Sequence, residues 1–372
     1  MADIVFDPSG SVEQFALNLK NISSNNGSVL ILACDANGFT KEEVDSYLSE
    51  STASIVGAIF PSIIYNAKKY DKGTIFIGLN DKMHINVLND ISQKEHDELD
   101  ADMEVQINGF DASVKTMFVF IDGLAKNIGE CINVLFDNYG LEVNYIGGGA
   151  GSLSFEQKPA LFTNQGLLKD AFVYAYSKRQ SSIGVNHGWK SISGPYQVTK
   201  SEDTIIQELD YKPAFEVYRH VVDQYASEPI HEENFFNIAK AFPFGLNTIT
   251  DEKIVRDPIV LNGTEMVGIV NVEEGSYVDI LQGNSDELVK AAKSAADISL
   301  EKMDFEDDFT LFIDCISRVL FLEEKIDSEI EAVYRVDTQL VGALTFGEIA
   351  NNGRNYLEFY NKTSVVGRIG HG

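Results

Sequence analysis

MFVFIDG (residues 117–123) and NYIGGGAGS (residues 144–152) are two apolar runs separated by one segment of helical periodicity. In that segment, apolar side chains recur at helical spacing at Ile128, Cys131, Ile132, Leu135 and Tyr139. A strand that is apolar on both faces, one amphipathic helix and a second apolar strand together form the pattern of a βαβ unit with parallel strands. The stretch therefore predicts an α/β fold.

The same pattern occurs twice more in the chain. VLILACD (29–35) precedes SIVGAIFPS (54–62), and TLFIDCISR (310–318) precedes LVGALTFGE (340–348), each pair enclosing a helical segment. One glycine falls at a nearly constant distance after each first strand, and these are Gly57, Gly147 and Gly342. We expect one structural unit used repeatedly, with these glycines at equivalent positions.

A further apolar run follows each pair: TIFIGL (74–79), DAFVYAYSK (170–178) and LEFYNKTSVV (357–366). The sequence thus predicts an α/β fold with α+β mixed sheets, built from repeated β-α-β-β units in two halves. The first strands end at small or polar residues such as Cys34-Asp35 and Asp122-Gly123, and the second strands break at glycine. We therefore expect a pocket at the glycine-rich strand ends.

The remaining segments fit around these units. Ser11 and Gln14 have the spacing of a capping box at the start of a helix, and Pro213 suits a second helix start. Residues 223–233 are polar and indicate a domain boundary. Beyond them we expect a meander of antiparallel strands in the runs VRDPIVLN, EMVGIVNV and SYVDILQG, followed by a long helix capped by Ser285.

Charge and hydropathy exclude several classes of partner. The 372 residues carry a formal net charge of −28, without a cluster of Lys and Arg, so neither nucleic acid nor an anionic membrane surface is an expected partner. The apolar stretches are shorter than the roughly 20 residues that span a bilayer, and MADIVFDPSG does not resemble a secretory signal. We expect a cytoplasmic protein with three buried, unpaired cysteines.

Two local motifs have competing interpretations. The run GGGAGS (147–152) suggests a phosphate loop, but it lacks the GKS or GKT ending, so a tight turn that faces a ligand or packs closely is favoured. His187 lies near the single tryptophan in GVNHGWK and suggests an axial haem ligand. The alternative interpretation is an ordinary histidine whose ring is hydrogen bonded within the protein.

Arg318 directly follows an apolar strand and needs a carboxylate partner. Glu348, at the end of the next strand of the same unit, is the expected one. The two form either a structural ion pair or the two halves of a site for an amino acid, with the guanidinium binding the carboxylate and Glu348 binding the ammonium group. Cys315, close to Arg318, also suggests an activated thiolate and hence a thiol-dependent enzyme, although no histidine base lies in the repeat loops.

Several pieces together resemble the FIST family of "F-box and intracellular signal transduction" sensory domains. Near the C-terminus they are Cys315-x-x-Arg318, the run GALTFGEIA with Gly347 and Glu348, and FYNKTSVV with Asn361 and Thr363. The glycine-rich element of the family's N-terminal half is similar to GGGAGS. The region that joins the two halves is similar to HGWKSISGPYQVT together with LDYKPAFEVY. Ser152 stands where the family more often has an acidic residue. The resemblance covers about residues 28–368.

The resemblance implies a sensory input protein for a small polar metabolite such as an amino acid, with no catalysis and no cofactor. We expect an N-terminal helix at 1–27, and the resemblance implies a FIST N-terminal domain at 28–225 and a FIST C-terminal domain at 226–372. A haem b-containing nitric-oxide sensor is the alternative, with His187 as the axial ligand. The expected signalling partner is a separate protein such as a histidine kinase or a cyclic-dinucleotide enzyme. The expected ligand-binding residues are Arg318, Glu348, Cys315, Gly347, Asn361, Thr363, Gly147, Gly148, Gly149 and Ser152.

Overall fold

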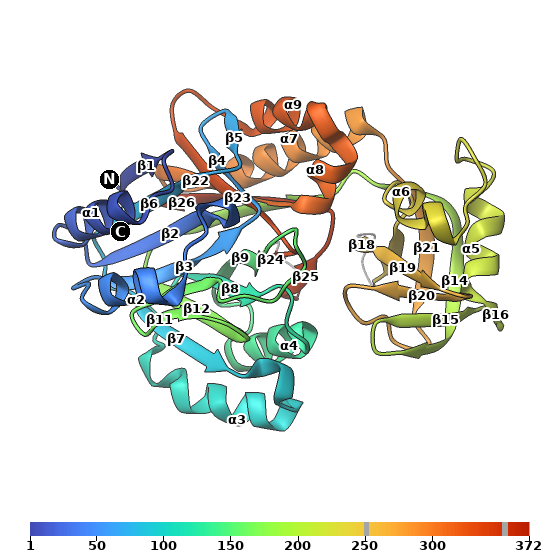
Figure 1. The fold of residues 1–372 in the computed structure, drawn as a ribbon, viewed down its shortest axis with the longest axis horizontal. Helices are drawn as coiled ribbons and strands as arrows, with labels where there is room; N and C mark the ends of the chain where they lie inside the picture. The colour runs from blue at the N-terminus through green and yellow to red at the C-terminus, as the bar shows by residue number, and fades with distance from the viewer. Residues whose placement is uncertain (249–252, 352–355, 372) are drawn as a thin grey trace.

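The computed structural model describes residues 1–248, 253–351 and 356–371. In this part of the chain, three six-stranded sheets form the main body, and an eight-stranded sheet forms a small lobe at one side of it (Figure 1). None of the helices that the structure describes combines the length and the apolar character needed to cross a bilayer.

The body is built from three units with the same order of elements, except that the third unit has two helices between its long strands where the others have one. The first unit consists of β1 (Asp3–Asp7), α1 (Val12–Ser23), β2 (Ser28–Cys34), α2 (Lys41–Ser49), β3 (Ser54–Phe60), β4 (Ser62–Tyr65), β5 (Lys68–Tyr70) and β6 (Thr74–Leu79). The second unit consists of β7 (His84–Asn89), α3 (His96–Gln106), β8 (Thr116–Asp122), α4 (Ile128–Tyr139), β9 (Asn144–Ala150), β10 (Leu161–Thr163), β11 (Gly166–Leu168) and β12 (Ala171–Ser177). The third unit consists of β13 (Ser181–Asn186), α7 (Ser285–Glu301), β22 (Asp307–Cys315), α8 (Ile316–Leu322), α9 (Ile326–Val333), β23 (Gln339–Thr345), β24 (Glu348–Ala350), β25 (Glu358–Tyr360) and β26 (Ser364–Gly370).

The small lobe is inserted into the third unit, between β13 and α7. It consists of β14 (Lys190–Glu202), β15 (Ile205–Leu209), β16 (Lys212–Pro213), α5 (Ala214–Val222), α6 (Phe235–Ala239), β17 (Phe244–Asn247), β18 (Lys253–Arg256), β19 (Pro258–Asn262), β20 (Glu265–Gly268) and β21 (Tyr277–Gln282). Short 3₁₀ helices in lobe and body are η1 (Asp35–Asn37), η2 (Ile91–Gln93), η3 (Ile107–Gly109), η4 (Glu232–Asn234) and η5 (Glu323–Lys325). Strands from both sides of the polar segment 223–233 share the lobe's sheet, because β14 pairs with β21. The division at residues 225 and 226 stays a prediction.

Each unit contributes a hairpin to the sheet of another unit. The sheet orders are β1-β6-β2-β3-β10-β11, β7-β12-β8-β9-β24-β25 and β13-β26-β22-β23-β4-β5. The first unit's hairpin thus lies in the third unit's sheet, the second unit's in the first unit's sheet, and the third unit's in the second unit's sheet. This cyclic exchange gives the body a pseudo-threefold arrangement and ties each unit to both others.

The predicted repeat is confirmed by the strand register. In each unit the first and second long strands are parallel, and the glycine occupies the same register position: Gly57 is opposite Ile31, Gly147 opposite Val119, and Gly342 opposite Phe312. A Cβ atom added at these glycines would lie 2.0, 1.7 and 2.0 Å from the carbonyl oxygen of the opposite residue. Glycine is therefore required because the neighbouring backbone approaches too closely for any side chain.

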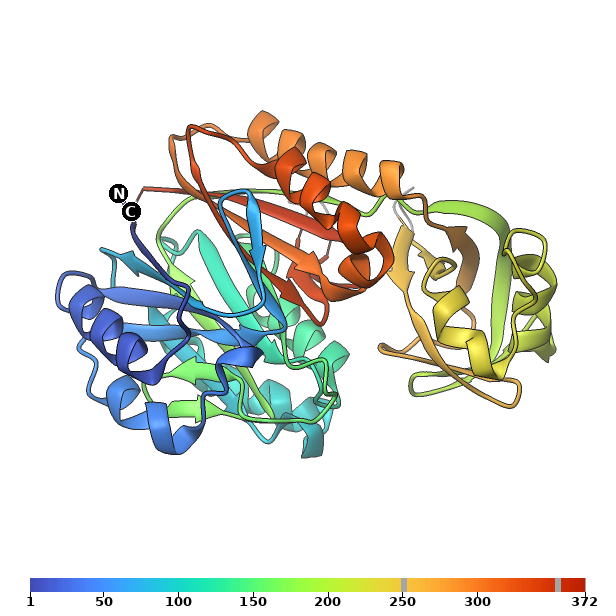
Figure 2. The same cartoon turned by 45° about the horizontal axis from the view of Figure 1, so that its top comes forward.

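The inner faces of the three sheets pack into a common apolar core that includes Phe76, Phe118 and Leu311. The helices cover the outside at three places, with α1 and α2 at the first, α3 and α4 at the second, and α7, α8 and α9 at the third (Figures 1 and 2). The α/β fold class with mixed sheets is confirmed. The small lobe has a core of its own, which includes Tyr218 and Phe244.

Several predicted elements need correction. The run at 357–366 is not one strand: β25 and β26 lie in different sheets and are separated by a turn at residues 361–363. Residues 1–27 hold strand β1 as well as the expected helix, because β1 pairs with β6. The N-cap of α7 is Asn284 rather than Ser285, and its side chain accepts hydrogen bonds from two first-turn N–H groups. The lobe strands are antiparallel as predicted, but β21 pairs with β14 and β17 and is not a neighbour of β20.

Candidate functional site

A cavity of about 520 Å³ lies at the carboxyl ends of the parallel strands in the first two units. β2 leads into Asp35, β8 ends at Asp122, and β9 leads into Gly151 and Ser152. Carboxyl ends of parallel strands are the usual position of ligand sites in α/β proteins. The lining residues are Asp35, Gly38, Phe39, Thr40, Lys41, Glu42, Ile59, Asp122, Leu124, Gly151, Ser152, Glu156, Lys158, Pro159 and Ala160.

The start of α2 forms one wall of this cavity. Thr40 caps the helix in a capping box, and its N–H donates to the Glu43 carboxylate at 3.1 Å. The first N–H groups of a helix, here those of Lys41 and Glu42, have no acceptor within the helix, and the helix dipole adds positive potential at this end. This wall therefore offers N–H donors to an anionic group, beside the carboxylates of Glu42 and Glu43 in the same turn.

Two aspartates at the strand ends bring carboxyl groups to the lining. Asp35 Oδ2 accepts a hydrogen bond from Ser152 Oγ at 2.6 Å. Asp122 is only 2% exposed, and its Oδ2 accepts hydrogen bonds from Gln157 Nε2 at 2.9 Å and from the Asp170 N–H at 2.8 Å. Burial raises the pKa of Asp122. Asp35 is the more accessible of the two and the better candidate for pairing with a cation.

Two exposed lysines add positive charge to a lining that also includes Glu42 and Glu156. Lys41 lies in the first turn of α2, and Lys158 lies in the 151–160 connection that leads from β9 to β10. The Lys158 ammonium is 3.4 Å from the exposed Glu156 carboxylate, a pair that solvent weakens. The cavity therefore offers both cationic and anionic groups to a ligand.

The pseudo-threefold arrangement explains why the cavity opens in this place. In the second unit, residues 151–160 connect the second long strand to its exchanged hairpin, whereas Pro61 makes the equivalent connection in the first unit and Phe346-Gly347 makes it in the third. At the strand end that follows β8, Phe346 of the third unit's connection fills the corresponding space. A Cβ atom on Gly123 would lie only 2.7 Å from the Phe346 Cβ. The longer connection leaves room that the shorter ones do not.

The predicted glycine-rich element has a packing role. A Cβ atom on Gly148 would lie 2.8 Å from the Gly347 carbonyl oxygen, and one on Gly149 would lie 2.4 Å from that of Phe346. The Gly149 N–H donates to the Gly347 carbonyl at 2.8 Å. These glycines lie in β9 and bring it against the third unit, so the run does not form a phosphate loop. Gly147, which packs on β8, serves in the same way.

Glu348 begins β24, opposite Gly148 of β9, and is fully buried. Its Oε1 accepts a hydrogen bond from Thr345 Oγ1 at 2.9 Å, and its Oε2 accepts one from the Thr363 N–H at 3.2 Å. Burial raises the pKa of Glu348 to about 8. The carboxyl group therefore holds a proton at neutral pH, inside the body and outside the cavity lining.

The predicted ion pair between Arg318 and Glu348 is wrong. Arg318, fully buried in α8, pairs with Glu329 of α9 and lies 3.1 Å from Asp314. Its remaining N–H groups donate to the backbone carbonyls of His187, Leu288 and Lys362 at 2.7, 3.0 and 3.1 Å. Arg318 therefore holds α7, α8 and α9 to the turn at residues 361–363, and its guanidinium keeps no donor for a ligand.

Cys315 and Thr363 lie beside Glu348. Burial and the neighbouring Glu348 carboxyl both raise the pKa of the Cys315 thiol, which opposes the thiolate that a cysteine enzyme requires. Thr363 Oγ1 donates to the Asn361 carbonyl at 2.8 Å, which fixes the turn between β25 and β26. These predicted site residues form one buried polar layer, separate from the 520 Å³ cavity, and among the predicted residues Ser152 lines that cavity.

The His187 imidazole is half-buried and already has partners. Its Nδ1 accepts a hydrogen bond from the Trp189 N–H at 2.9 Å, and the ring is also hydrogen bonded to the Lys253 backbone. Burial, together with the Arg318 guanidinium, lowers the pKa of His187 to about 4. A neutral imidazole can bind iron, but this ring would have to break its present contacts to do so. Haem ligation by His187 stays a prediction, and the arrangement does not fit it as it stands.

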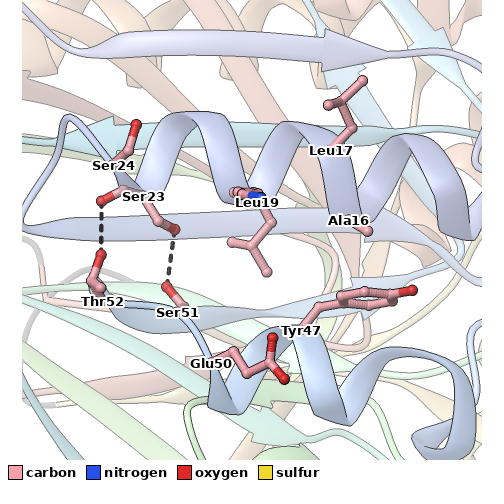
Figure 3. Close-up of a pocket in the computed structure, with 10 residues that line it drawn as sticks. Ala16, Leu17, Leu19, Ser23, Ser24, Tyr47, Glu50, Ser51 and Thr52 are labelled. Atoms are coloured by element: carbon pink, nitrogen blue, oxygen red, sulfur yellow. Dashed lines mark hydrogen bonds between the residues drawn. The ribbon is translucent and has the colours of Figure 1, made fainter.

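A second cavity of about 520 Å³ lies between α1 and α2 (Figure 3). Its lining includes Leu17, Tyr47 and Glu50, and the Ser51 hydroxyl donates to Ser23 Oγ at 2.9 Å beside it. It is found where α1 and α2 end, next to the amino ends of the parallel strands. Its lining offers one lysine, one glutamate and the buried Ser23, whose hydroxyl is already hydrogen bonded to Ser51, so the strand-end cavity, with the buried Asp122 and Ser152, is the stronger candidate.

The comparisons with known proteins agree with this architecture. The FIST N domain matches residues 28–212, and the FIST C domain matches residues 214–351. The uncharacterized protein MJ1623 of Methanocaldococcus jannaschii is 24% identical over 280 residues, a match that covers 68% of this chain and 53% of that relative. The chain thus spans about half the length of the relative. FIST domains are sensory domains of signal transduction and a non-enzymatic domain type. Because the two FIST domains together cover most of its length, the chain belongs to the FIST family.

Proposed function

We propose that this protein is a cytoplasmic sensory input protein that binds a small zwitterionic metabolite, such as an amino acid, in the strand-end cavity. The observation that carries the proposal is the pairing of opposite charges around one cavity of about 520 Å³. The α2 start and Lys158 suit a carboxylate, and Asp35 suits an ammonium group. A volume in this range is typical of sites for small ligands.

The ligand's own charges explain the choice of class. A purely anionic ligand would meet Asp35 and Asp122 as well as the chain's net charge of −28. A purely cationic ligand would meet the helix start and two ammonium groups. A zwitterion offers its carboxylate to Lys158 and the start of α2 and its ammonium group to Asp35.

The signal passes, in this proposal, to a separate chain such as a histidine kinase or a cyclic-dinucleotide enzyme. The 151–160 connection is suited to report binding, because it lines the cavity and continues into β10, which pairs with β3 of the first unit. A ligand that orders this connection changes the surface between the first two units. The protein itself then needs no catalytic group.

The test is isothermal titration calorimetry with a panel of amino acids, selected first by thermal shift. For a ligand that binds the wild-type protein, Lys158→Ala and Asp35→Asn should each weaken binding by about 10- to 150-fold, because each removes a charge-assisted hydrogen bond of roughly 1.5–3 kcal/mol. Lys169→Ala and Asp3→Asn, at exposed positions outside the cavity lining, are the matched controls. Equal affinity for all four variants would place the ligand elsewhere.

A further inference from the structure

β7 is an edge strand of the second unit's sheet, and one side of it meets no further strand in the described part of the chain. On its other side it pairs with β12 in a regular antiparallel register, with Val87 opposite Val173. β7 and α3 lie next to each other at the lower end of the body in Figure 1. An open edge of this kind presents a row of backbone N–H and C=O groups with which another strand can pair.

The side chain of Gln106, the last residue of α3, pairs with the middle of this edge. The Val87 N–H donates to Gln106 Oε1 at 3.1 Å, and Gln106 Nε2 donates to the Val87 carbonyl at 2.9 Å. One carboxamide thus makes the two hydrogen bonds that a residue of a neighbouring antiparallel strand would exchange with Val87. Alternate residues of a strand direct their backbone groups to the same side, so those of Ile85 and Asn89 also face the edge.

A groove with a volume of about 360 Å³ lies along this edge. Its lining residues are His84, Ile85, Asn86, Val87, Val105, Gln106 and Gln165. Gln165 belongs to the turn between β10 and β11, so the groove lies between the end of α3 and the hairpin that the second unit contributes to the first unit's sheet. The Gln106 carboxamide therefore closes one position of the edge and leaves open space beside it.

The two faces of β7 meet different surroundings. Ile85 and Val87 are half-buried and pack against the common apolar core of the body. Leu88, on the opposite face, packs with Met103 of α3. A strand added at this edge would therefore place alternate side chains next to Ile85 and Val87 and the remaining ones next to α3.

α3 is acidic along its whole length. It contains no Lys or Arg, and its carboxylates are those of Asp97, Glu98, Asp100, Asp102 and Glu104. The Lys94 ammonium neutralises one of them, because it pairs with Asp102 at 2.6 Å. A second copy of this chain would add the same acidic helix and the same net charge of −28 to the interface, whereas a basic segment is attracted to it.

We propose that the β7 edge is a docking site for an extended basic segment of a partner protein, which adds to the second unit's sheet as a further strand. The segment replaces the Gln106 carboxamide at Val87 and pairs with the outward backbone groups of Ile85 and Asn89. Its apolar side chains cover Ile85 and Val87. Its alternate Lys or Arg side chains face the carboxylates of α3, and their stems cover Val105, which is 74% exposed.

The test is fluorescence anisotropy with labelled peptides and the full chain. The probes have the sequence acetyl-Lys-X-Lys-X-Lys-X-Lys-amide, in which X is Val, Ile or Thr. One matched set has Glu in place of Lys, and a second set is N-methylated at two adjacent central residues, which removes one N–H donor from each edge of the peptide. We expect saturable binding of the unmethylated basic peptides and none of the two matched sets. This interface does not depend on a ligand in the strand-end cavity, so the two proposals can fail separately.

Gln106→Ala should tighten the binding of the basic peptides about 5-fold or more, because the two hydrogen bonds of the Gln106 carboxamide no longer compete with the peptide. Gln93→Ala, at an exposed position in η2 outside the groove, is the matched control and should bind the peptides as the wild type does. Hydrogen–deuterium exchange locates the bound peptide: in the wild type and in Gln106→Ala, it should slow exchange in residues 84–89.

Three results would overturn the proposal. If no basic peptide binds either protein, Gln106 serves only to shield the edge from other strands. If basic, acidic and N-methylated peptides bind alike, or residues 84–89 keep their exchange rates in the complex, the peptides bind without strand pairing at β7. If Gln106→Ala forms dimers in analytical ultracentrifugation and binds no peptide, the occupant of the edge is a second copy of the chain.

Discussion

At the scale of single residues, the interior of the third unit is unusually polar. Glu348 is enclosed between Thr345 and Thr363, and Arg318 is enclosed between Asp314 and Glu329. Charged groups of this kind are stable in a protein only when they are paired or when they lose their charge. Arg318 is paired with carboxylates, whereas the raised pKa of Glu348 favours its neutral form.

The raised pKa of Glu348 makes the stability of the protein depend on pH. Its value of about 8 in the folded state lies above the usual value of 4.5. Below pH 4.5 the group is protonated in both states. As pH rises toward 8, the unfolded chain releases the proton and the folded protein retains it, so the free energy of unfolding falls across this window, by about 1.4 kcal/mol per unit of pKa difference.

Urea unfolding of Glu348→Gln between pH 5 and pH 8 checks this point, because the variant has no proton to lose. Its stability should fall less over that range than the wild-type stability does. Glu301→Gln, at an exposed position at the end of α7, should keep the wild-type slope. Parallel slopes for wild type and Glu348→Gln would mean that Glu348 is already ionised in the folded protein.

The sequence could not identify the partner of Arg318 or the charged residues of the cavity. The apolar strand before Arg318 indicates that the guanidinium needs a carboxylate partner. From the sequence alone, Glu329 and Glu348 are equally suitable partners. Only the packing of α8 against α9 selects Glu329. Lys158 carries no signal in sequence, because it lies in an irregular connection, whereas the Thr40 and Glu43 capping box that forms the cavity wall has a visible spacing.

At the scale of elements, the repeated unit depends on one close approach between two parallel strands. Gly57, Gly147 and Gly342 each lie against a backbone carbonyl, and this position was predictable because glycine recurs at the same place after each first strand. The exchange of hairpins between units was not predictable, since it depends on which open sheet edge each hairpin reaches. The sequence pattern at 357–366 likewise predicts one strand, although β25 and β26 in this run belong to two different sheets.

Gly147→Ala should destabilise the protein by about 1–3 kcal/mol or more, because its Cβ would lie 1.7 Å from the Val119 carbonyl oxygen and the strands would have to separate. Gly129→Ala is the matched control: this glycine lies in α4, and a Cβ there meets nothing within 4 Å. Alanine at that position should stabilise the helix by up to about 1 kcal/mol. Thermal melts of both variants give the comparison, and a neutral Gly147→Ala would contradict the close-packing role.

At the scale of the whole molecule, the chain is a closed ring of three units with one insertion. Arg179, between the second and third units, pairs with Asp81 at 2.9 Å and with Asp308 at 2.8 Å, and so joins all three units near the chain ends. The ring makes three strand-end places equivalent in topology. Differences between the connections, rather than the fold itself, then decide which place can hold a ligand.

Hydrogen–deuterium exchange with and without an amino acid that binds tests this account most directly. The account predicts that the ligand slows exchange in residues 35–42 and 151–160, the two segments that supply most of the cavity lining, and leaves the equivalent connections at Pro61 and Phe346-Gly347 unchanged. Protection centred on either of those connections, or on the α1–α2 surface, with residues 151–160 unaffected, would contradict it.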